Sequence, residues 1–304
     1  MKTSRLILTC ILVTFVAALP AIAGPRIFVS GLGNDANPGT REQPKRTFAS
    51  ALTVTDPGGE VVVLDPAGFA SSTLLIDKSV SIIVPAGIFG GIRVTSGNAI
   101  TVAAGPEDTV VLRGLTLNNG GGTNGIEFQS GAALHVENCI ISEFTRGIDF
   151  SPAADGDLLV KDSIVRGNNR GIHIDSSSGK AIASIDRCRM QGNIDGIFAG
   201  NNSRVTVRDS VATHNGSQGF HAVGTNVEMG ITHCVSAHNS DGARASSGSS
   251  PRAVIRLAYS TITDNARGLE TFETGIIYSL GNNLVHGNGV DISGTGSFVA
   301  IPGR

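Results

Sequence analysis

Hydrophobic and polar residues alternate along most of this chain, in short runs that predict β-strands. In 160-VKDSIVRGNNRGIHI-174, one run alternates around Val160 and Ile164, and a second places His173 between two isoleucines. An Asn and a Gly separate the two runs. No window long enough for a helix interrupts the repeats of this pattern. Each unit is therefore predicted to be a strand, a turn, a second strand and a second turn.

The unit returns about every two dozen residues, with a Cys or Ser, in most copies an Asn five positions later, and then a Gly. The Gly recurs in steps of 21 to 26 residues, at Gly147, Gly171, Gly196, Gly219, Gly242, Gly268 and Gly289. A repeat of this length predicts a solenoid. A leucine-rich repeat has a similar Asn column, but it needs Leu where this chain has Cys or Ser. We therefore expect an all-β fold, a single-stranded right-handed parallel β-helix of about ten coils.

Parallel stacking of the coils would place equivalent residues about 4.8 Å apart. The repeated Asn would then form a ladder at one turn, in which each side-chain amide bonds the next and satisfies buried turn backbone. We expect the Gly to supply a positive φ at the bend that follows. The predicted ladder consists of Asn168, Asn193, Asn215, Asn239, Asn265 and Asn288.

The cysteines of the repeats share one column with serines. Cys139, Cys188 and Cys234 lie two coils apart, so roughly 9 to 10 Å by strand spacing. That separation is beyond disulfide reach. We expect buried packing thiols.

The amino-acid composition limits the classes of partner and ligand that the protein could bind. The formal net charge is −2 and no long charge run occurs, which argues against nucleic acid, because phosphates require a basic surface. The absence of Trp and the 40 Gly indicate a core of small and β-branched residues. No metal site and no cofactor are expected from the residue pattern.

The N-terminal segment has the layout of a secretory signal peptide. Lys2 and Arg5 precede an apolar run, and Pro20 and a small-residue triplet follow it, so cleavage is expected before Gly24. The expected divisions are 1–23 signal peptide, 24–59 N-terminal strand and capping helix, and 60–304 β-helix. The mature chain would be secreted, periplasmic or at the cell surface, with no membrane span after cleavage.

The capping helix is predicted from 44-PKRTFASALTV-54, with Pro at its first turn. Phe48, Ala51, Leu52 and Val54 would lie on its apolar side. Such a helix would cover the open end of the first coil, whose edge backbone otherwise invites aggregation. The C-terminus offers no matching helix, so self-association through that end is an open alternative.

These segments together resemble a known group. The stretches 27-IFVSGLGNDANPGTREQPKRTFASAL-52, 61-VVVLDPAGF-69 and 111-VLRGLTL-117, followed by the Asn-Gly coils, resemble exported bacterial right-handed β-helix repeat proteins of the pectate-lyase-like superfamily. The resemblance implies fold and export but no single activity. Its members often carry two cysteines where Gly39 and Lys45 stand here, so no disulfide is expected at the cap.

Candidate chemistry lies on the outward positions of one sheet, where successive coils line up a shallow groove. The positions after the repeated Gly predict an outward row of Asp149, His173, Phe198, His221, Arg244, Glu270 and Asp291. An enzyme would use Asp149 and Asp175, with α-carbons roughly 8 Å apart, as an acid and base pair beside His173. A solvated polar face is the simpler interpretation.

A binding surface is the other use of this sheet. Arginines would bind uronate carboxylates in bidentate fashion, and an aromatic ring would lie against a sugar face. The ligand-binding candidates are Arg146, Arg170, Phe198, His221, Arg244 and Glu270.

The sequence therefore favours a non-catalytic exported β-helix that binds extracellular or cell-wall polysaccharide or has a structural role at the cell surface. The segments that the resemblance associates with polygalacturonases and with the Ca²⁺ sites of pectate lyases are missing. A divergent polysaccharide lyase or glycoside hydrolase acting on uronate polymers remains an alternative, and Ca²⁺ would be needed only there. A self-associating adhesive rod is the second alternative.

Overall fold

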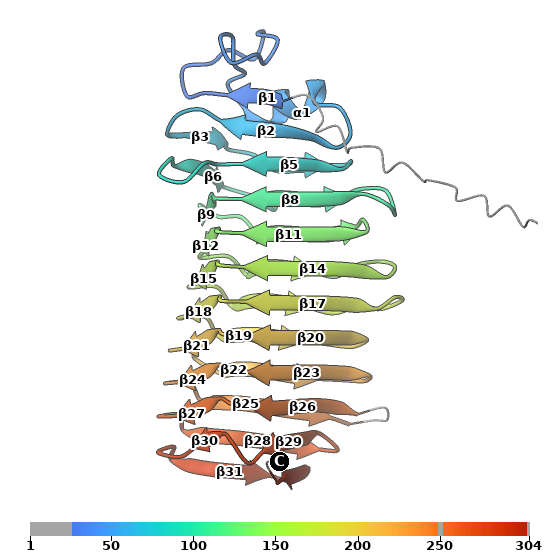
Figure 1. The fold of residues 1–304 in the computed structure, drawn as a ribbon, viewed down its shortest axis with the longest axis vertical. Helices are drawn as coiled ribbons and strands as arrows, with labels where there is room; N and C mark the ends of the chain where they lie inside the picture. Colours follow the sequence, from blue (N-terminus) through green and yellow to red (C-terminus); the bar gives the residue numbers. More distant parts are fainter. Residues whose placement is uncertain (1–25, 249–251, 303–304) are drawn as a thin grey trace, which may run out of the picture.

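The computed structural model describes residues 26–248 and 252–302, and the expected signal peptide lies outside them. The chain winds into a rod of stacked coils, as predicted (Figure 1). Three parallel sheets, A, B and C, run along the rod, and their inward side chains share one hydrophobic core.

Sheet A has twelve strands, in the order β1 (Arg26–Val29), β2 (Gly59–Val63), β5 (Val80–Ile83), β8 (Thr109–Arg113), β11 (Ala133–Glu137), β14 (Gly156–Lys161), β17 (Ala181–Asp186), β20 (Ser203–Arg208), β23 (Val227–Thr232), β26 (Ala253–Ala258), β29 (Ile276–Leu280) and β32 (Ser297–Ile301). Sheet B has ten: β3 (Ala67–Ala70), β6 (Gly90–Val94), β9 (Leu115–Asn119), β12 (Ile140–Ser142), β15 (Ile164–Arg166), β18 (Arg189–Gln191), β21 (Val211–Thr213), β24 (Val235–Ala237), β27 (Thr261–Thr263) and β30 (Leu284–Val285). Sheet C has ten: β4 (Leu74–Ile76), β7 (Ile100–Ala103), β10 (Asn124–Ser130), β13 (Arg146–Phe150), β16 (Arg170–Ile174), β19 (Asp195–Ala199), β22 (Gln218–Val223), β25 (Asp241–Ser247), β28 (Arg267–Glu273) and β31 (Val290–Gly294).

Each regular coil holds three strands, not the two that alternation predicted. The run around Val160 and Ile164 is two strands, β14 and β15, because Asp162 adopts φ 51° between them. A left-handed residue turns the chain while the apolar alternation continues through it. The alternation alone therefore hides the corner.

The Asn side chains stack along the turn between sheets B and C. Asn193 Oδ1 accepts hydrogen bonds from the backbone N and from Nδ2 of Asn168, both at 3.0 Å, and Asn193 Nδ2 donates to the carbonyl of Val165 at 3.0 Å. The same pattern repeats to Asn288, where Asp291 Oδ1 accepts the last amide at 3.0 Å. The ladder satisfies turn backbone that water cannot reach.

The repeated Gly has a different cause from the one predicted, because the Gly residues that open the strands of sheet C do not adopt positive φ. A Cβ on Gly171 would lie 2.5 Å from the carbonyl oxygen of Gly196 on the next coil. The same close approach recurs from Gly147 to Gly242. Glycine is needed there so that the coils can pack at strand spacing.

The three repeat cysteines are free and buried. Cys139 Sγ lies 3.3 Å from the carbonyl oxygen of Glu137, and its backbone N–H donates to Ser163 Oγ at 3.1 Å. Burial raises the pKa of Cys139 to about 12 and those of Cys188 and Cys234 to about 11. These thiols pack and do not ionise near neutral pH.

One helix covers the N-terminal end. Helix α1 (Phe48–Val54) begins after Thr47, which caps it by accepting from the Ser50 N–H, so it starts later than predicted. Phe48 is fully buried and its ring lies 5.1 Å from that of Phe69, whereas Val54 is exposed, contrary to expectation. No disulfide holds this cap within the described residues, and the buried Lys45 donates from Nζ to the Asp35 carbonyl at 2.8 Å.

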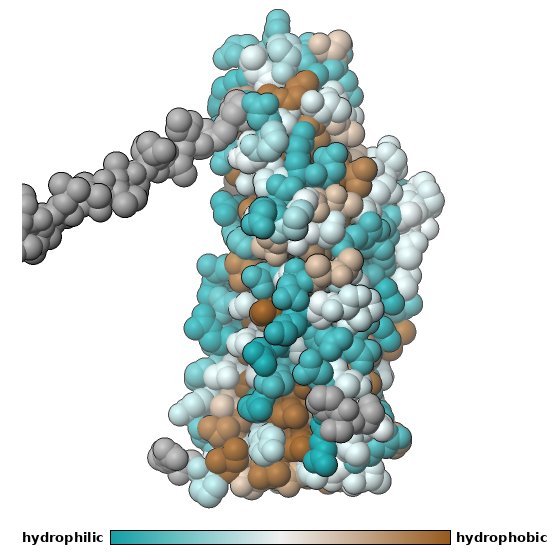
Figure 2. Space-filling view, turned by 90° about the vertical axis from the view of Figure 1, so that its right-hand side faces the viewer, coloured by the Kyte–Doolittle hydropathy of each residue, from teal (hydrophilic) through white to brown (hydrophobic). Residues whose placement is uncertain are grey.

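The opposite end differs from the capped one. Five hydrophobic side chains of the last described coil are exposed, because no other described coil lies on them. They are Leu284, Val290, Ile292, Val299 and Ile301. Figure 2 shows hydrophobic residues gathered at this end of the rod. The end therefore presents open strand edges and apolar surface together.

Candidate functional site

The outward row of sheet C is continuous from coil to coil. Asp149 pairs in register with His173, His173 with Phe198, and the pairing continues through His221, Arg244 and Glu270. The last residue of the row is Ser293, not Asp291, because Gly289 lies two residues earlier in its coil than the other Gly anchors. The row is much less exposed than a solvated face, and Asp149 and His173 are buried.

Asp149 and His173 form a tight pair on this face. His173 Nδ1 lies 2.8 Å from Asp149 Oδ1, and Arg146 Nη1 lies 2.7 Å from Oδ2. Burial alone would raise the pKa of Asp149, but the hydrogen bonds from His173, Arg146 and Ser151 outweigh it and lower the pKa below its usual value. Asp149 is thus held as a carboxylate, a state unsuited to a general acid.

The third catalytic candidate does not join this pair. Asp175 lies two residues after His173 on the same coil, and its Oδ1 is buried without a hydrogen-bond partner among the described residues. No interaction joins it to Asp149 or His173 within that part of the chain. The structure therefore assembles two of the three candidates.

All three candidate arginines, Arg146, Arg170 and Arg244, and the neighbouring Arg267 are already paired with acids. Arg146 binds Asp149, Arg170 lies 3.8 Å from Asp195, and Arg267 donates to Asp241 at 2.5 Å. Arg244 lies 3.4 Å from Glu270 and 3.7 Å from Asp241; its other neighbour, Ser246, accepts from Nε at 3.0 Å. These internal pairs consume the positive charge that a uronate track would need.

Two rings occupy the middle of the row. The guanidinium of Arg170 lies 3.8 Å above the Phe198 ring, which also contacts His173 and His221 at centroid distances of 5.1 and 5.2 Å. His221 is partly exposed, but both of its ring nitrogens are buried without a hydrogen-bond partner in the described chain. Burial lowers the pKa of His221 to about 4, so it is neutral at neutral pH.

Sequence reasoning missed an acid pair at the C-terminal part of the row. Asp241 is fully buried, yet hydrogen bonds from Arg267 and Gln218 outweigh burial and lower its pKa. Burial and the neighbouring Asp241 raise the pKa of Glu270. The pKa values of these two neighbouring carboxyl groups are thus shifted in opposite directions, as in an acid and base pair.

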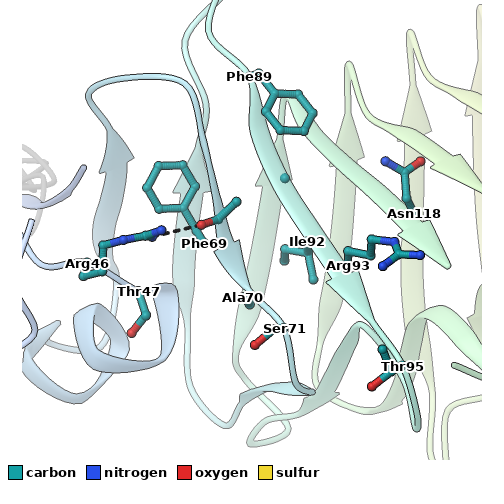
Figure 3. A pocket seen from close by; sticks show the side chains of 12 residues that line it. Arg46, Thr47, Phe69, Ala70, Ser71, Phe89, Ile92, Arg93, Thr95 and Asn118 are labelled. Atoms are coloured by element: carbon teal, nitrogen blue, oxygen red, sulfur yellow. Dashed lines mark hydrogen bonds between the residues drawn. The ribbon is translucent and has the colours of Figure 1, made fainter. Parts of the chain in front are cut away.

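Sequence reasoning also missed a groove, a cavity of about 930 Å³ over the first coils of sheet B (Figure 3). It lies beside α1 and is lined by Arg46, Thr47, Gly68, Phe69, Ala70, Ser71, Phe89, Gly91, Ile92, Arg93, Thr95 and Asn118. Phe89 is half exposed, while Phe69 and Ile92 are buried.

The groove exists because two outward positions carry no side chain. Gly68 and Gly91 pair in register on β3 and β6, and a Cβ on Gly68 would meet only open space. A Cβ on Gly91 would instead lie 2.6 Å from the Phe89 ring, which lies over that strand. The sequence signal is 89-FGGIR-93, an aromatic residue before two glycines and an arginine.

The two arginines of the groove differ from those of sheet C. Arg46 Nη1 donates to the Gly68 carbonyl at 2.9 Å, which holds the guanidinium at the rim. Within residues 26–248 and 252–302, no carboxylate forms a salt bridge with the side chain of Arg46 or Arg93. Their charge is available to a ligand.

Metal-ligating side chains are scattered. No group of three or more His, Cys, Asp or Glu side chains is gathered for a metal in the described part of the chain. The closest pair of imidazoles is His214 and His238, whose rings stack with centroids 4.6 Å apart on the exposed turn before the Asn ladder. Separately, no described helix is long and apolar enough to cross a membrane.

Comparison with known proteins agrees with the fold. Residues 96–298 match the family model described as periplasmic copper-binding protein (NosD). An alginate lyase from Paenibacillus sp. str. FPU-7 superposes with a TM-score of 0.64 at 12% identity, over 84% of this chain and 96% of that one. The pectate lyase Pel9A superposes with a TM-score of 0.60 at 17% identity, over 92% of this chain and 78% of that one. A search of curated sequences gives no significant match.

Proposed function

The chain belongs to the NosD family of periplasmic copper-binding proteins, and from this premise we propose that it is a periplasmic, non-catalytic β-helix that binds acidic saccharides in the groove over sheet B. The observation that carries the proposal is the half-exposed ring of Phe89 in one groove with the guanidinium groups of Arg46 and Arg93, neither of which forms a salt bridge within the described residues.

The chemistry of the groove suits a sugar acid. An exposed aromatic ring offers a flat apolar surface to the C–H face of a pyranose. A guanidinium binds a carboxylate through two parallel hydrogen bonds, with more geometric specificity than an ammonium. Asn118 and Thr95 add hydroxyl-binding groups along the same wall. The polymer class expected is therefore a uronate-containing glycan.

The lining also explains why binding without catalysis is proposed. None of its twelve residues is Asp, Glu, His, Cys or Lys. Acid–base cleavage of a glycosidic bond needs a proton donor and a proton acceptor within hydrogen-bond reach of the bond. The groove supplies charge and stacking but no group that titrates near neutral pH.

An enzymatic function is the first alternative, and Asp241 and Glu270 support it better than Asp149 and Asp175. The opposed pKa shifts of this pair fit an acid and a base, and Arg244 and Arg267 surround them. The burial of Asp241 argues against an enzymatic function, because a substrate would have to reach a fully buried carboxylate. Ca²⁺ enters only with a lyase reaction.

A self-associating rod is the second alternative. It is favoured by the exposed apolar residues and open strand edges of the last coil. Such an end fits a second protein surface better than water. This role is compatible with a binding groove at the other end of the rod.

The test is isothermal titration of the mature protein with oligogalacturonate and oligomannuronate, using a neutral maltooligosaccharide as the ligand control. Binding of the acidic oligomers that weakens at least tenfold in Arg93→Ala and in Phe89→Ala is expected. Arg204→Ala is the matched control, since Arg204 is an exposed arginine on sheet A. Equal affinity in all variants, or preference for the neutral sugar, would reject the groove.

A further inference from the structure

Sheet B differs from the other two sheets in the charged residues of its strands. None of its ten strands contains Asp, Glu, Lys or His. The charged residues in these strands are Arg93, Arg166 and Arg189, and all three are exposed. The outer face of sheet B therefore carries positive charge, with no acidic residue in any of its strands.

The arginines of sheet B also lack acidic partners. Every arginine in the strands of sheets A and C forms a salt bridge with an acid. Among the described residues, no salt bridge joins Arg93, Arg166 or Arg189 to a carboxylate. Asp162, at the corner between sheets A and B, is bound by Arg187 at 2.8 Å. The positive charge of sheet B is therefore available to a ligand.

The strand register places two of these arginines in one row, with neutral polar residues between them. Arg93 pairs with Asn118, and Asn118 pairs with Ser142. Ser142 pairs with Arg166, so the two arginines lie three coils apart, about 14 Å. Arg189 lies on the next coil, with its α-carbon about 8 Å from that of Arg166. Ser142 Oγ donates to Asn118 Oδ1 at 2.7 Å, which leaves the amide nitrogen of Asn118 as a donor for a ligand.

An apolar row runs beside this polar row. Gly91 pairs with Thr116, and Thr116 pairs with Ile140. Ile140 pairs with Ile164, and both isoleucines are half-buried on the outer face. A cavity of about 550 Å³ borders Thr116 and Ile140, so the hollowed surface continues beyond the groove. Guanidinium and amide groups beside apolar side chains suit a sugar chain, whose ring edges are polar and whose ring faces carry C–H bonds.

Tight turns leave this face open in the regular coils. In the coil of β15, residues 162–163 join sheet A to sheet B, and residues 167–169 join sheet B to sheet C. Figure 1 shows the strands of sheet B from β9 to β27 one after another along one edge of the rod. A linear polymer can therefore lie along sheet B, parallel to the rod.

We propose that the acidic saccharide is a linear uronate polymer that continues from the groove along sheet B. Its carboxylates bind Arg93, Arg166 and Arg189, and its hydroxyl groups bind Asn118; these four residues are called the track. The track rests on the proposed function, because Arg93 and Asn118 also line the groove. Single-stranded nucleic acid is a poorer fit, because its bases stack on exposed aromatic rings, and the one aromatic residue in these strands, Phe69, is buried.

The test is isothermal titration with a galacturonate dimer and a galacturonate octamer at one fixed salt concentration. The dimer is too short to join Arg93 to Arg166, whereas the octamer covers the whole track. In Arg166→Ala/Arg189→Ala, the Kd of the octamer should rise at least tenfold and the Kd of the dimer should stay unchanged. Both side chains are exposed and form no salt bridge in the described chain, so the variant should fold, which thermal melting would check.

Arg204→Ala/Arg256→Ala is the matched control, because it removes two exposed arginines from sheet A with the same change in net charge. It should alter neither Kd. An octamer that binds Arg166→Ala/Arg189→Ala as tightly as the wild type would overturn the track and leave the groove in place. A dimer and an octamer that both fail to bind the wild type would instead reject the proposed function, and the track with it.

Two further results would reject a track that is specific for saccharides. One is an equal loss of octamer affinity in the sheet A control, which would indicate a general attraction of anions to the rod. The other is single-stranded DNA of the same charge that binds as tightly as the octamer.

Discussion

His173 Nδ1 lies 2.8 Å from Asp149 Oδ1 across two adjacent coils, and both side chains are buried on the outer face of sheet C. Arg146 completes the arrangement by binding the second carboxylate oxygen at 2.7 Å. The carboxylate of Asp149, which the sequence offers as a catalytic group, is thus already paired with His173 and Arg146. Its expected contribution is to stability.

The Asp149 pair predicts an acid-dependent loss of stability. The folded pKa is below the unfolded value of about 3.9, so the unfolded chain binds the proton first as the pH falls. The stabilisation is present above about pH 4 and disappears as the pH falls through the folded pKa. Urea unfolding gives the free energy of unfolding at pH 7 and below pH 4. The difference between the two values should be smaller in Asp149→Asn than in the wild type. Asp157→Asn, which removes an exposed carboxylate, should leave the dependence unchanged.

His221 predicts a second pH effect, at higher pH. Its folded pKa of about 4 lies below the unfolded value of about 6.5, so the unfolded state is protonated first between these values. Stability should therefore fall by about 1 to 2 kcal/mol between pH 7 and pH 5. His221→Phe should remove this slope and cost little at pH 7, because the buried nitrogens have no hydrogen-bond partner in the described structure. An unchanged slope in that variant would contradict the assignment.

The Asn ladder predicts that removing one of its side-chain amides lowers the stability of the protein substantially. In Asn215→Ala, the N–H of Asn193 and the side chains on both sides lose partners at 2.9 to 3.2 Å. The loss should be about 1 to 3 kcal/mol, the range for buried groups left unsatisfied. Asn201→Ala is the control, since Asn201 is exposed and accepts a hydrogen bond from the Thr225 N–H outside the ladder. Chemical denaturation that ranks the two variants equally would argue against the ladder.

The last coil predicts concentration-dependent association. Ile292 is 46% exposed on β31, at the open end of the core. If this end pairs with a second copy, Ile292→Glu should lower the sedimentation coefficient at high protein concentration to that of the monomer. The control is Ile182→Glu, an exposed isoleucine on sheet A away from the end. A wild-type protein that stays monomeric at all concentrations would remove the rod alternative.

The regular part of the fold could be predicted because its spacing is nearly constant. Asn215 and its equivalents occur at one position per coil, so stacking follows from the period alone. The position of the repeated Gly was predicted correctly, but its cause was not. A sequence does not distinguish a Gly needed for positive φ from a Gly needed for close approach of two coils. Asp291 was misplaced because the last coil carries its Gly two residues early.

The candidate site was harder to predict because its properties are three-dimensional. Acids neutralise Arg146 and Arg267, and this pairing depends on the directions of their side chains, which the sequence does not give. All but one of the groove's lining residues lie before residue 110, outside the regular repeats, so Phe89 and Arg93 belonged to no column.

The measurement that tests the central claim most directly is product formation from pectin, polygalacturonate and alginate, with and without Ca²⁺. Unsaturated product absorbance and reducing ends would be followed together. A non-catalytic binding protein predicts no product by either method, while the same oligomers bind in the groove. Product that forms in the wild type and disappears in Glu270→Gln, or in Asp149→Ala or Asp175→Ala, would contradict the account and make the protein an enzyme.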